Sequence, residues 1–192
     1  MKKTFKKLFA LALIVFSSYS FTNLLLEKTE INLDESNITW KGYKVTGSHE
    51  GTIKFKSGTL TFNDGTLVDG AFSMDMNSIK CTDLEGGSAG KLEGHLKSKD
   101  FFGTESHPNA MLQFKEVTVN GENNYRVKGD LTIKGITNNI DFDFVVDGNN
   151  ATAAIKIDRT TYDIKYGSSS FFEGLKDKPI YEDFDINVNL KF

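Results

Sequence analysis

The segment Gly86-Gly87-Ser88-Ala89-Gly90 has the spacing G-x-S-x-G of a hydrolase nucleophile motif. In that motif a parallel strand precedes the serine, a helix follows it, and an acidic residue and then a histidine lie well downstream. The histidines that follow here, His95 and His107, come soon after the serine, and no alternation of strands and helices surrounds them. The segment therefore indicates a flexible glycine loop that leads into a helix, rather than a serine nucleophile.

Three histidines, His49, His95 and His107, are the residues that could bind a metal ion or act as bases. A zinc site normally shows closely spaced ligands, such as two histidines four residues apart or pairs of cysteines. The histidines here are scattered, and no cysteine or acidic residue stands with them in such a pattern. We therefore expect no metal site and no cofactor. A phosphate-binding loop is not indicated either, because no Gly-Lys-Ser/Thr follows the glycine-rich stretches.

A polar site is better indicated at Asp158-Arg159-Thr160, which directly follows an apolar alternating segment. An arginine at the end of a strand can clamp a carboxylate or a phosphate with two parallel hydrogen bonds. The other interpretation is a surface ion pair with a neighbouring aspartate, and the sequence leaves both open. Two aromatic pairs, Phe101-Phe102 and Phe171-Phe172, stand in loops, where they form either ordinary core or the walls of a ligand mouth.

The elements that must position these residues are mostly strands. From Ile31 onward apolar and polar residues alternate in many segments, which are separated by turn signals such as Asn63-Asp64-Gly65 and Asn120-Gly121. This spacing predicts about eight or more antiparallel strands, in a sandwich or a barrel. The barrel is favoured because the strands are long and the Phe-rich inner face is opposed by small residues, namely Gly129, Ala151 and Ala153.

One stretch departs from the strand pattern. Residues 91–98 have the composition of a short helix, and an irregular loop continues to Pro108, which bars continuation of the helix. A single helix and loop in an antiparallel barrel usually cover an end of it, so we expect this stretch to act as a lid. A second loop is expected over residues 167–179. A bend or bulge is expected at Ser57-Gly58, within one long strand.

The N-terminus has the features of an export signal. Residues 1–20 combine four lysines, an apolar run over residues 8–16 and small residues at the end. The apolar run is too short to cross a bilayer, so we expect cleavage and a periplasmic or secreted protein. Without these four lysines, 19 basic side chains face 26 acidic ones. The resulting net charge of about −7 disfavours nucleic acid as a partner. The single cysteine, Cys81, allows no internal disulfide.

Several segments together form a specific pattern. The most specific are the two stretches over residues 95–102 (HLKSKDFF) and 129–135 (GDLTIKG). Further matches are Ile38-Thr39-Trp40-Lys41-Gly42, His49-Glu50-Gly51, Met76-Asn77-Ser78-Ile79, His107-Pro108 and Asp158-Arg159. With these segments the chain resembles the YceI-like proteins, a family of lipocalin-like periplasmic binding proteins, from about Asn37 to the C-terminus. The resemblance implies an antiparallel barrel around a hydrophobic channel that takes a long isoprenoid or a similar amphiphilic lipid, and it implies no catalysis.

We therefore interpret the chain as an all-β, lipocalin-like antiparallel β-barrel of about eight strands, with one short helix and loop as a lid. Residues 1–20 are the signal peptide, 21–36 the lead-in with the first strand, and 37–192 the YceI-like lipid-binding barrel. His49 and Arg159 are the candidates for contact with a polar headgroup, and Asp163 places an acid near it. The side chains expected to line the channel are Trp40, Phe55, Phe72, Met74, Leu96, Phe101, Phe102, Phe114, Phe142 and Phe144.

The expected function is that of an exported, non-enzymatic protein that sequesters or carries a long apolar lipid, such as a polyisoprenoid or an isoprenoid quinone. Its expected partners are this lipid, a membrane in transient contact, and a second copy if an edge strand pairs across a dimer. Two other classes stay open. One is a packed barrel that serves as an interaction or structural module without a ligand. The other, with less support, is a small hydrolase or isomerase that uses cavity histidines.

Overall fold

The computed structural model describes residues 25–174 and 179–192 of the 192-residue chain. The predicted signal peptide lies outside these residues. None of the helices within them is long and apolar enough to span a membrane. The elements in chain order are β1 (Leu26–Glu30), β2 (Asn37–Lys44), β3 (Gly47–Asn63), β4 (Thr66–Cys81), α1 (Gly86–Lys97), β5 (Asn109–Val119), β6 (Asn124–Ile133), β7 (Ile136–Asp147), β8 (Asn150–Asp158), the 3-10 helix η1 (Arg159–Tyr162) and β9 (Ile180–Lys191).

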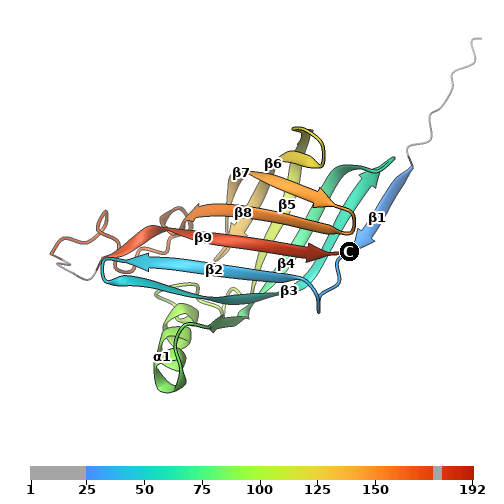
Figure 1. Ribbon diagram of the computed structural model, residues 1–192. Coiled ribbons are helices and arrows are strands. Elements are labelled where there is room, and N and C mark those ends of the chain that lie inside the picture. The colour runs from blue at the N-terminus through green and yellow to red at the C-terminus, as the bar shows by residue number, and fades with distance from the viewer. Residues whose placement is uncertain (1–24, 175–178) are drawn as a thin grey trace, which may run out of the picture.

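Eight of these strands form a closed antiparallel ring (Figure 1). The hydrogen-bonded order is β3-β2-β9-β8-β7-β6-β5-β4, and β4 pairs again with β3 to close the barrel. β1 lies outside the ring, where it pairs with residues 59–63 at the end of β3. The prediction of an all-β, lipocalin-like barrel of about eight strands is therefore confirmed.

The hairpin of β3 and β4 is the longest in the barrel, with strands of 17 and 16 residues. Its turn places Asp64 and Gly65 at φ angles of 49° and 75°, as the predicted turn signal requires. The register of the hairpin shifts just before Gly58, next to the predicted bend. Packing also favours glycine at position 58, because a Cβ there would lie 2.6 Å from Ile31 Cδ1 and 2.7 Å from Phe72 Cδ1.

Phenylalanine rings from β4, β5 and β7 meet in the middle of the barrel. The Phe114 ring centroid of β5 lies 5.7 Å from that of Phe72, 5.9 Å from that of Phe142 and 5.5 Å from that of Phe144. Tilted ring pairs at such distances contribute about 0.5–1.5 kcal/mol each beyond the burial of their area. Aromatic packing therefore joins β5 on the inside to its ladder partner β4 and also to β7, from which β6 separates it in the sheet.

Helix α1 is longer than the sequence predicts. It spans Gly86–Lys97 instead of residues 91–98, so the predicted flexible glycine loop forms its first turns. Gly86 begins the helix at a φ of +57°, which glycine adopts without strain. Glycines are poor helix formers, and tertiary contacts offset this weakness. Leu96 is buried, and the Glu93 carboxylate accepts a hydrogen bond at 3.0 Å from the last backbone N–H of β4.

The loop behind α1 folds back onto the end of the barrel. The Phe102 N–H donates to the Leu96 carbonyl at 3.0 Å, and the Gly103 N–H donates to the Ser98 carbonyl at 2.8 Å. These bonds fix the loop on the last turn of α1, with Phe101 buried and Phe102 half-buried. The helix and loop therefore cover this end of the barrel, as predicted.

Candidate functional site

An apolar cavity of about 90 Å³, which we call the inner cavity, lies inside the barrel. All eight strands of the ring contribute to its wall, and every side chain in the wall is apolar. Such a cavity offers water no hydrogen-bond partner, so it stays dry and favours apolar ligands. Its wall consists of Ile38, Ile53, Phe55, Phe72, Met74, Met76, Phe102, Ala110, Leu112, Phe114, Leu131, Ile133, Ile140, Phe142, Phe144, Ala153, Ile155, Ile157, Phe184, Ile186, Val188 and Leu190.

A second cavity of about 70 Å³, the outer cavity, lies where the loop behind α1 meets the barrel end. Ile53, Phe102 and Phe184 line both cavities, so the two adjoin. The outer cavity differs from the inner one in that polar residues stand in its wall beside the apolar ones. Its wall consists of Trp40, Gly42, Tyr43, Ile53, Ile79, Leu96, Phe101, Phe102, Arg159, Ile180, Tyr181, Asp183 and Phe184.

Phe102 is one of the three side chains that line both cavities. Its ring centroid lies 5.1 Å from that of Phe101 and 6.4 Å from that of Phe184, and both pairs are T-shaped. The side chain is half-buried and belongs to a loop rather than to a strand. Phe102 is the one shared side chain that belongs to a loop, whereas Ile53 and Phe184 belong to β3 and β9.

Arg159 is the one buried charged residue in the described part of the chain, with 2% of its surface exposed. Its guanidinium donates to three backbone carbonyls, from Nη1 to Ile164 O at 2.5 Å, from Nη2 to Ile180 O at 2.9 Å and from Nε to Tyr181 O at 3.1 Å. The guanidinium carbon also lies 5.6 Å from the centroid of the Phe101 ring. Arg159 thus joins η1, the start of β9 and the loop behind α1 at the outer cavity.

The surroundings of Arg159 exclude one of the two interpretations that the sequence left open. The surface ion pair is wrong, because the side chain is buried. Burial lowers the pKa of Arg159, and the charges of Glu182 and Asp158 oppose this shift. Asp163, expected near a headgroup, is exposed and instead pairs with Lys165 at 2.7 Å. Three of the five Arg159 N–H groups already donate to backbone carbonyls, and its headgroup contact stays a prediction.

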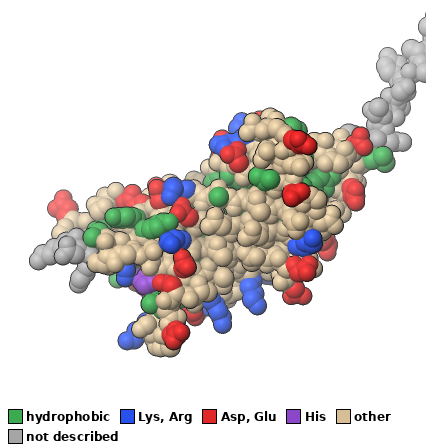
Figure 2. Space-filling view, in the orientation of Figure 1, with side chains coloured by type: hydrophobic (Ala, Val, Ile, Leu, Met, Phe, Trp, Pro, Cys, Tyr) green, Lys and Arg blue, Asp and Glu red, His purple; other side chains and the backbone are tan. Residues whose placement is uncertain are grey.

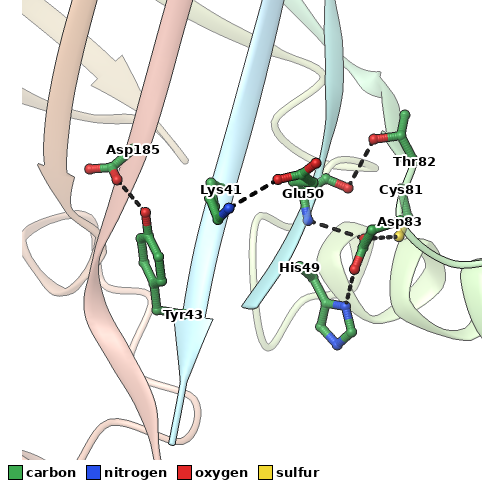
Figure 3. Close-up of polar contacts among 8 residues, drawn as sticks. All are labelled: Lys41, Tyr43, His49, Glu50, Cys81, Thr82, Asp83 and Asp185. Atoms are coloured by element: carbon green, nitrogen blue, oxygen red, sulfur yellow. Dashed lines mark hydrogen bonds and ion pairs between the residues drawn. The ribbon is translucent and has the colours of Figure 1, made fainter. Parts of the chain in front are cut away.

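His49 belongs to a polar network beside the barrel end (Figure 3). Its Nδ1 donates to Asp83 Oδ2 at 2.8 Å, the Glu50 N–H donates to Asp83 Oδ1 at 3.1 Å, and Cys81 Sγ donates to the same oxygen at 3.0 Å. Desolvation alone would raise the pKa of Asp83, but the hydrogen bonds outweigh it and hold this pKa well below its usual range. Asp83 therefore ties the β2–β3 hairpin to the connection between β4 and α1.

The order of groups in this network does not match nucleophilic catalysis. A catalytic cysteine needs a base in contact with its sulfur, whereas Asp83 stands between Cys81 and His49. Burial, and then the hydrogen bond to Asp83, raise the pKa of the Cys81 thiol and disfavour the reactive thiolate. His49 lines neither cavity, so its predicted headgroup contact stays a prediction that the geometry does not favour.

The other two histidines lie apart from His49. His95 of α1 packs edge-on against Tyr166, with ring centroids 4.4 Å apart. His107 packs beside Gly135, where an added Cβ would lie 3.2 Å from its Cε1 atom. Within residues 25–174 and 179–192, no three His, Cys, Asp or Glu side chains are grouped as metal ligands.

Residues 30–192 match the YceI-like domain. The chain belongs to the YceI-like family. A UPF0312 protein of Photorhabdus laumondii is 37% identical over 87 residues, which are 45% of this chain and 43% of the relative. A UPF0312 protein of Staphylococcus aureus strain N315 is 39% identical over 88 residues, which are 40% of this chain and 48% of the relative. The matched regions thus span less than half of these curated relatives.

Solved structures share the fold at low identity. BcnA of Burkholderia cenocepacia superposes with a TM-score of 0.67 at 18% identity, over 83% of this chain and 98% of that one. A polyisoprenoid binding domain of Saccharophagus degradans, implicated in plant cell wall breakdown, gives a TM-score of 0.58 at 14% identity, over 88% of this chain and 97% of that one. At these identities the likeness shows the barrel fold.

In this YceI-like barrel, all ten side chains predicted to line a channel stand in the cavity walls. Trp40, Leu96 and Phe101 line the outer cavity, Phe102 lines both, and the other six line the inner one. Their contact with a ligand stays a prediction. The wall side chains of β9 were not among those predicted, although their alternation with polar residues could have revealed them: Phe184, Ile186, Val188 and Leu190.

Proposed function

We propose that this YceI-like protein is a non-enzymatic carrier that holds the chain of an isoprenoid lipid inside the barrel. The observation that carries the proposal is the inner cavity with its wholly apolar wall, which adjoins a second cavity at the covered end through Phe102. The fold relative from Saccharophagus degradans is described as a polyisoprenoid binding domain, which supports the same ligand class. The Asp83-centred network supports a binding role over catalysis, because it does not activate Cys81.

The size of the cavities requires the barrel interior to adapt. A volume of about 90 Å³ is well below the roughly 300–1,000 Å³ of pockets that enclose a drug-sized ligand. The ligand must therefore displace side chains, and Met74 and Met76 in the wall are flexible enough to move. Each CH₂ group that leaves water contributes about 0.8 kcal/mol, so a few isoprene units offset the cost of this rearrangement.

Phe102 is the gate in this proposal. A chain that enters from the outer cavity must pass its ring before it reaches the inner cavity. The headgroup then stays in the outer cavity, near Trp40, Tyr43 and Arg159. Since three of the five Arg159 N–H groups already donate to backbone carbonyls, we propose a neutral headgroup, such as a quinone or an alcohol, rather than a pyrophosphate.

Export is part of the proposal. Residues 1–20 have the charge and apolar pattern of a cleaved signal peptide. A carrier that works outside the cytoplasm would take its lipid from a membrane in transient contact. A homodimer through the outer edge of β1 is compatible with the barrel, because among the described strands β1 pairs with β3 alone.

Native mass spectrometry of the mature protein, purified from its exported compartment and followed by organic extraction, tests the proposal. We expect one long-chain prenyl lipid per protein, and preference for a prenyl quinone or alcohol over a prenyl pyrophosphate in competition. A clean ligand-free mass that persists after incubation with all three lipids would refute the carrier function. The small cavities and packed rings would then favour a barrel that serves as an interaction module without a ligand.

A further inference from the structure

The exposed aromatic side chains of the described residues all lie in one segment. Tyr166, Phe171, Phe172 and Tyr181 are 47%, 50%, 49% and 54% exposed, and they belong to the connection between η1 and β9 or to the start of β9. Within residues 25–174 and 179–192, every other Phe, Tyr and Trp is buried or half-buried. Figure 2 shows hydrophobic side chains gathered at the end of the molecule that carries this connection.

Phe171 and Phe172 are held outward by a hydrogen-bonded turn, residues 168–172, which we call the aromatic turn. Ser168 is fully buried, and its hydroxyl donates to Glu182 Oε1 of β9 at 2.6 Å. The backbone N–H groups of Phe171 and Phe172 donate to the Ser168 carbonyl at 3.3 and 3.1 Å. The Ser170 N–H donates to the Ser168 hydroxyl at 3.2 Å. The fold therefore presents these two rings to solvent instead of packing them.

The aromatic turn stands at the rim of the outer cavity. Tyr181 lines that cavity and also shares a surface cleft with Ser169 and Ser170 of the turn. Ile180, a second residue of the cavity wall, donates its N–H to the Gly167 carbonyl at 2.8 Å. The exposed rings and the entrance to the apolar interior are therefore parts of one surface.

Two charged residues beside the aromatic turn, Lys165 and Glu182, have partners within the fold. Lys165 lies 5.1 Å from the Phe171 ring centroid, but its ammonium pairs with Asp163 at 2.7 Å. The Glu182 carboxylate accepts the Ser168 hydroxyl. Glu173, which follows Phe172, is acidic and exposed, so the described charges offer no strong attraction to anionic lipids. Aromatic rings with polar neighbours are well suited to the interface of a bilayer, where apolar area supplies the binding energy.

We propose that the aromatic turn docks this protein on a lipid bilayer, with Phe171 and Phe172 inserted among the lipids and the outer cavity facing the membrane. The inference rests on the proposed carrier function and names the partner from which the lipid is taken. Two half-exposed rings bury together about the area of one whole side chain. Their removal should weaken membrane binding roughly tenfold to a hundredfold.

Co-sedimentation of the mature protein with phosphatidylcholine vesicles tests the docking. The double variant Phe171→Ser and Phe172→Ser should lose binding by the stated factor. The double variant Met111→Ser and Val119→Ser removes two exposed apolar side chains of β5 and should bind like the wild type. Added phosphatidylglycerol or salt should change binding little. Phe172→Trp should keep binding, with a blue shift of emission above the constant background of buried Trp40.

The proposal is overturned if the wild type does not bind these vesicles, or if the Phe171 and Phe172 double variant binds equally well. It is also overturned if that variant changes only the oligomeric state, measured by sedimentation velocity, because the rings then form a contact between copies. Native mass spectrometry with a prenyl quinone supplied in solution separates docking from carriage. If the Phe171 and Phe172 double variant still binds the quinone but no longer binds vesicles, the docking proposal is supported. If the wild type binds vesicles but not the quinone, the docking proposal is supported and the carrier function is refuted.

Discussion

Removal of the Phe102 ring tests whether this side chain is the gate between the two cavities. Phe102→Ala deletes a ring that both cavities share, so the cavities merge. Phe62→Ala is the matched control. Phe62 is also half-buried and packs on another ring, that of Phe192 at a centroid distance of 5.6 Å, but it lines neither cavity. Both variants lose the same atoms, and only one of them opens the path.

The ring contacts of Phe102 set the size of the expected effect. Its T-shaped contacts with Phe101 and Phe184 are worth about 0.5–1.5 kcal/mol each, so moving the ring aside costs about 1–3 kcal/mol. With a factor of ten for each 1.4 kcal/mol or so, this cost slows entry roughly 5- to 150-fold. Phe102→Ala should therefore take up lipid faster by that factor, while Phe62→Ala should take it up at the wild-type rate.

Trp40 provides the signal for this experiment. It is the chain's single tryptophan and lines the outer cavity, so a prenyl quinone should quench its emission on entry in stopped-flow mixing. Urea unfolding checks that both variants fold, with an expected loss of about 2–4 kcal/mol in each. Equal uptake rates for folded Phe102→Ala and wild type would refute the gate. Faster uptake by Phe62→Ala would show that any loosening of the barrel suffices.

Three further predictions concern stability, each measured by urea unfolding. Arg159→Met should lower the free energy of unfolding by about 3–5 kcal/mol, because three backbone carbonyls lose a charged donor. Arg159→Lys should recover only part of this loss. An unchanged free energy of unfolding in Arg159→Met would contradict the role of these bonds. Gly90→Ala and Gly94→Ala should each stabilise the protein by about 0.5–1 kcal/mol, since nothing lies within 4 Å of the added Cβ, whereas Gly51→Ala should destabilise it because its Cβ would lie 1.8 Å from Lys80 O. The pKa of Asp83 is lower in the folded protein than its ordinary value of 3.8, so its contribution is complete at neutral pH and is lost as the pH falls below about 4. Asp83→Asn should lower the free energy of unfolding by about 1 kcal/mol at neutral pH and should weaken its dependence on pH below about 4. The same pH dependence in both proteins would show that the Asp83 carboxylate does not cause it.

The barrel could be predicted because each strand shows a local alternation of apolar and polar residues. Alternation along β6 places Val127 and Leu131 inside and Arg126 and Lys128 outside, and each strand repeats this rule independently. The same rule places the phenylalanines of β4, β5 and β7 in the cavity walls. The start of α1 was predicted five residues late for a local reason too. Glycine has a low helix propensity, and the contacts that stabilise the first turns come from elsewhere in the fold.

The candidate site could be predicted only in part, because its decisive partners have no sequence signature. Arg159 was identified by its place after an apolar strand, but it bonds to the carbonyls of Ile164, Ile180 and Tyr181, which any residues would supply. The position of Phe102 between two cavities depends on how its loop folds back on α1. Sequence spacing cannot show such a fold-back, since the bonds that fix Phe102 and Gly103 run to backbone carbonyls at the end of α1.

The loops at the covered end and the strands of the barrel should affect different steps of lipid binding, which separate measurements can distinguish. The aromatic turn, the outer cavity, Phe102 and the inner cavity lie in this order from the surface inward. A change at Phe171 and Phe172 should therefore slow transfer from vesicles but leave the affinity for lipid in solution intact. A change at Phe102 should alter the uptake rate from both sources. A larger side chain at Ala153, deep in the inner wall, should weaken affinity whatever the source, because it fills the space that the chain of the lipid needs.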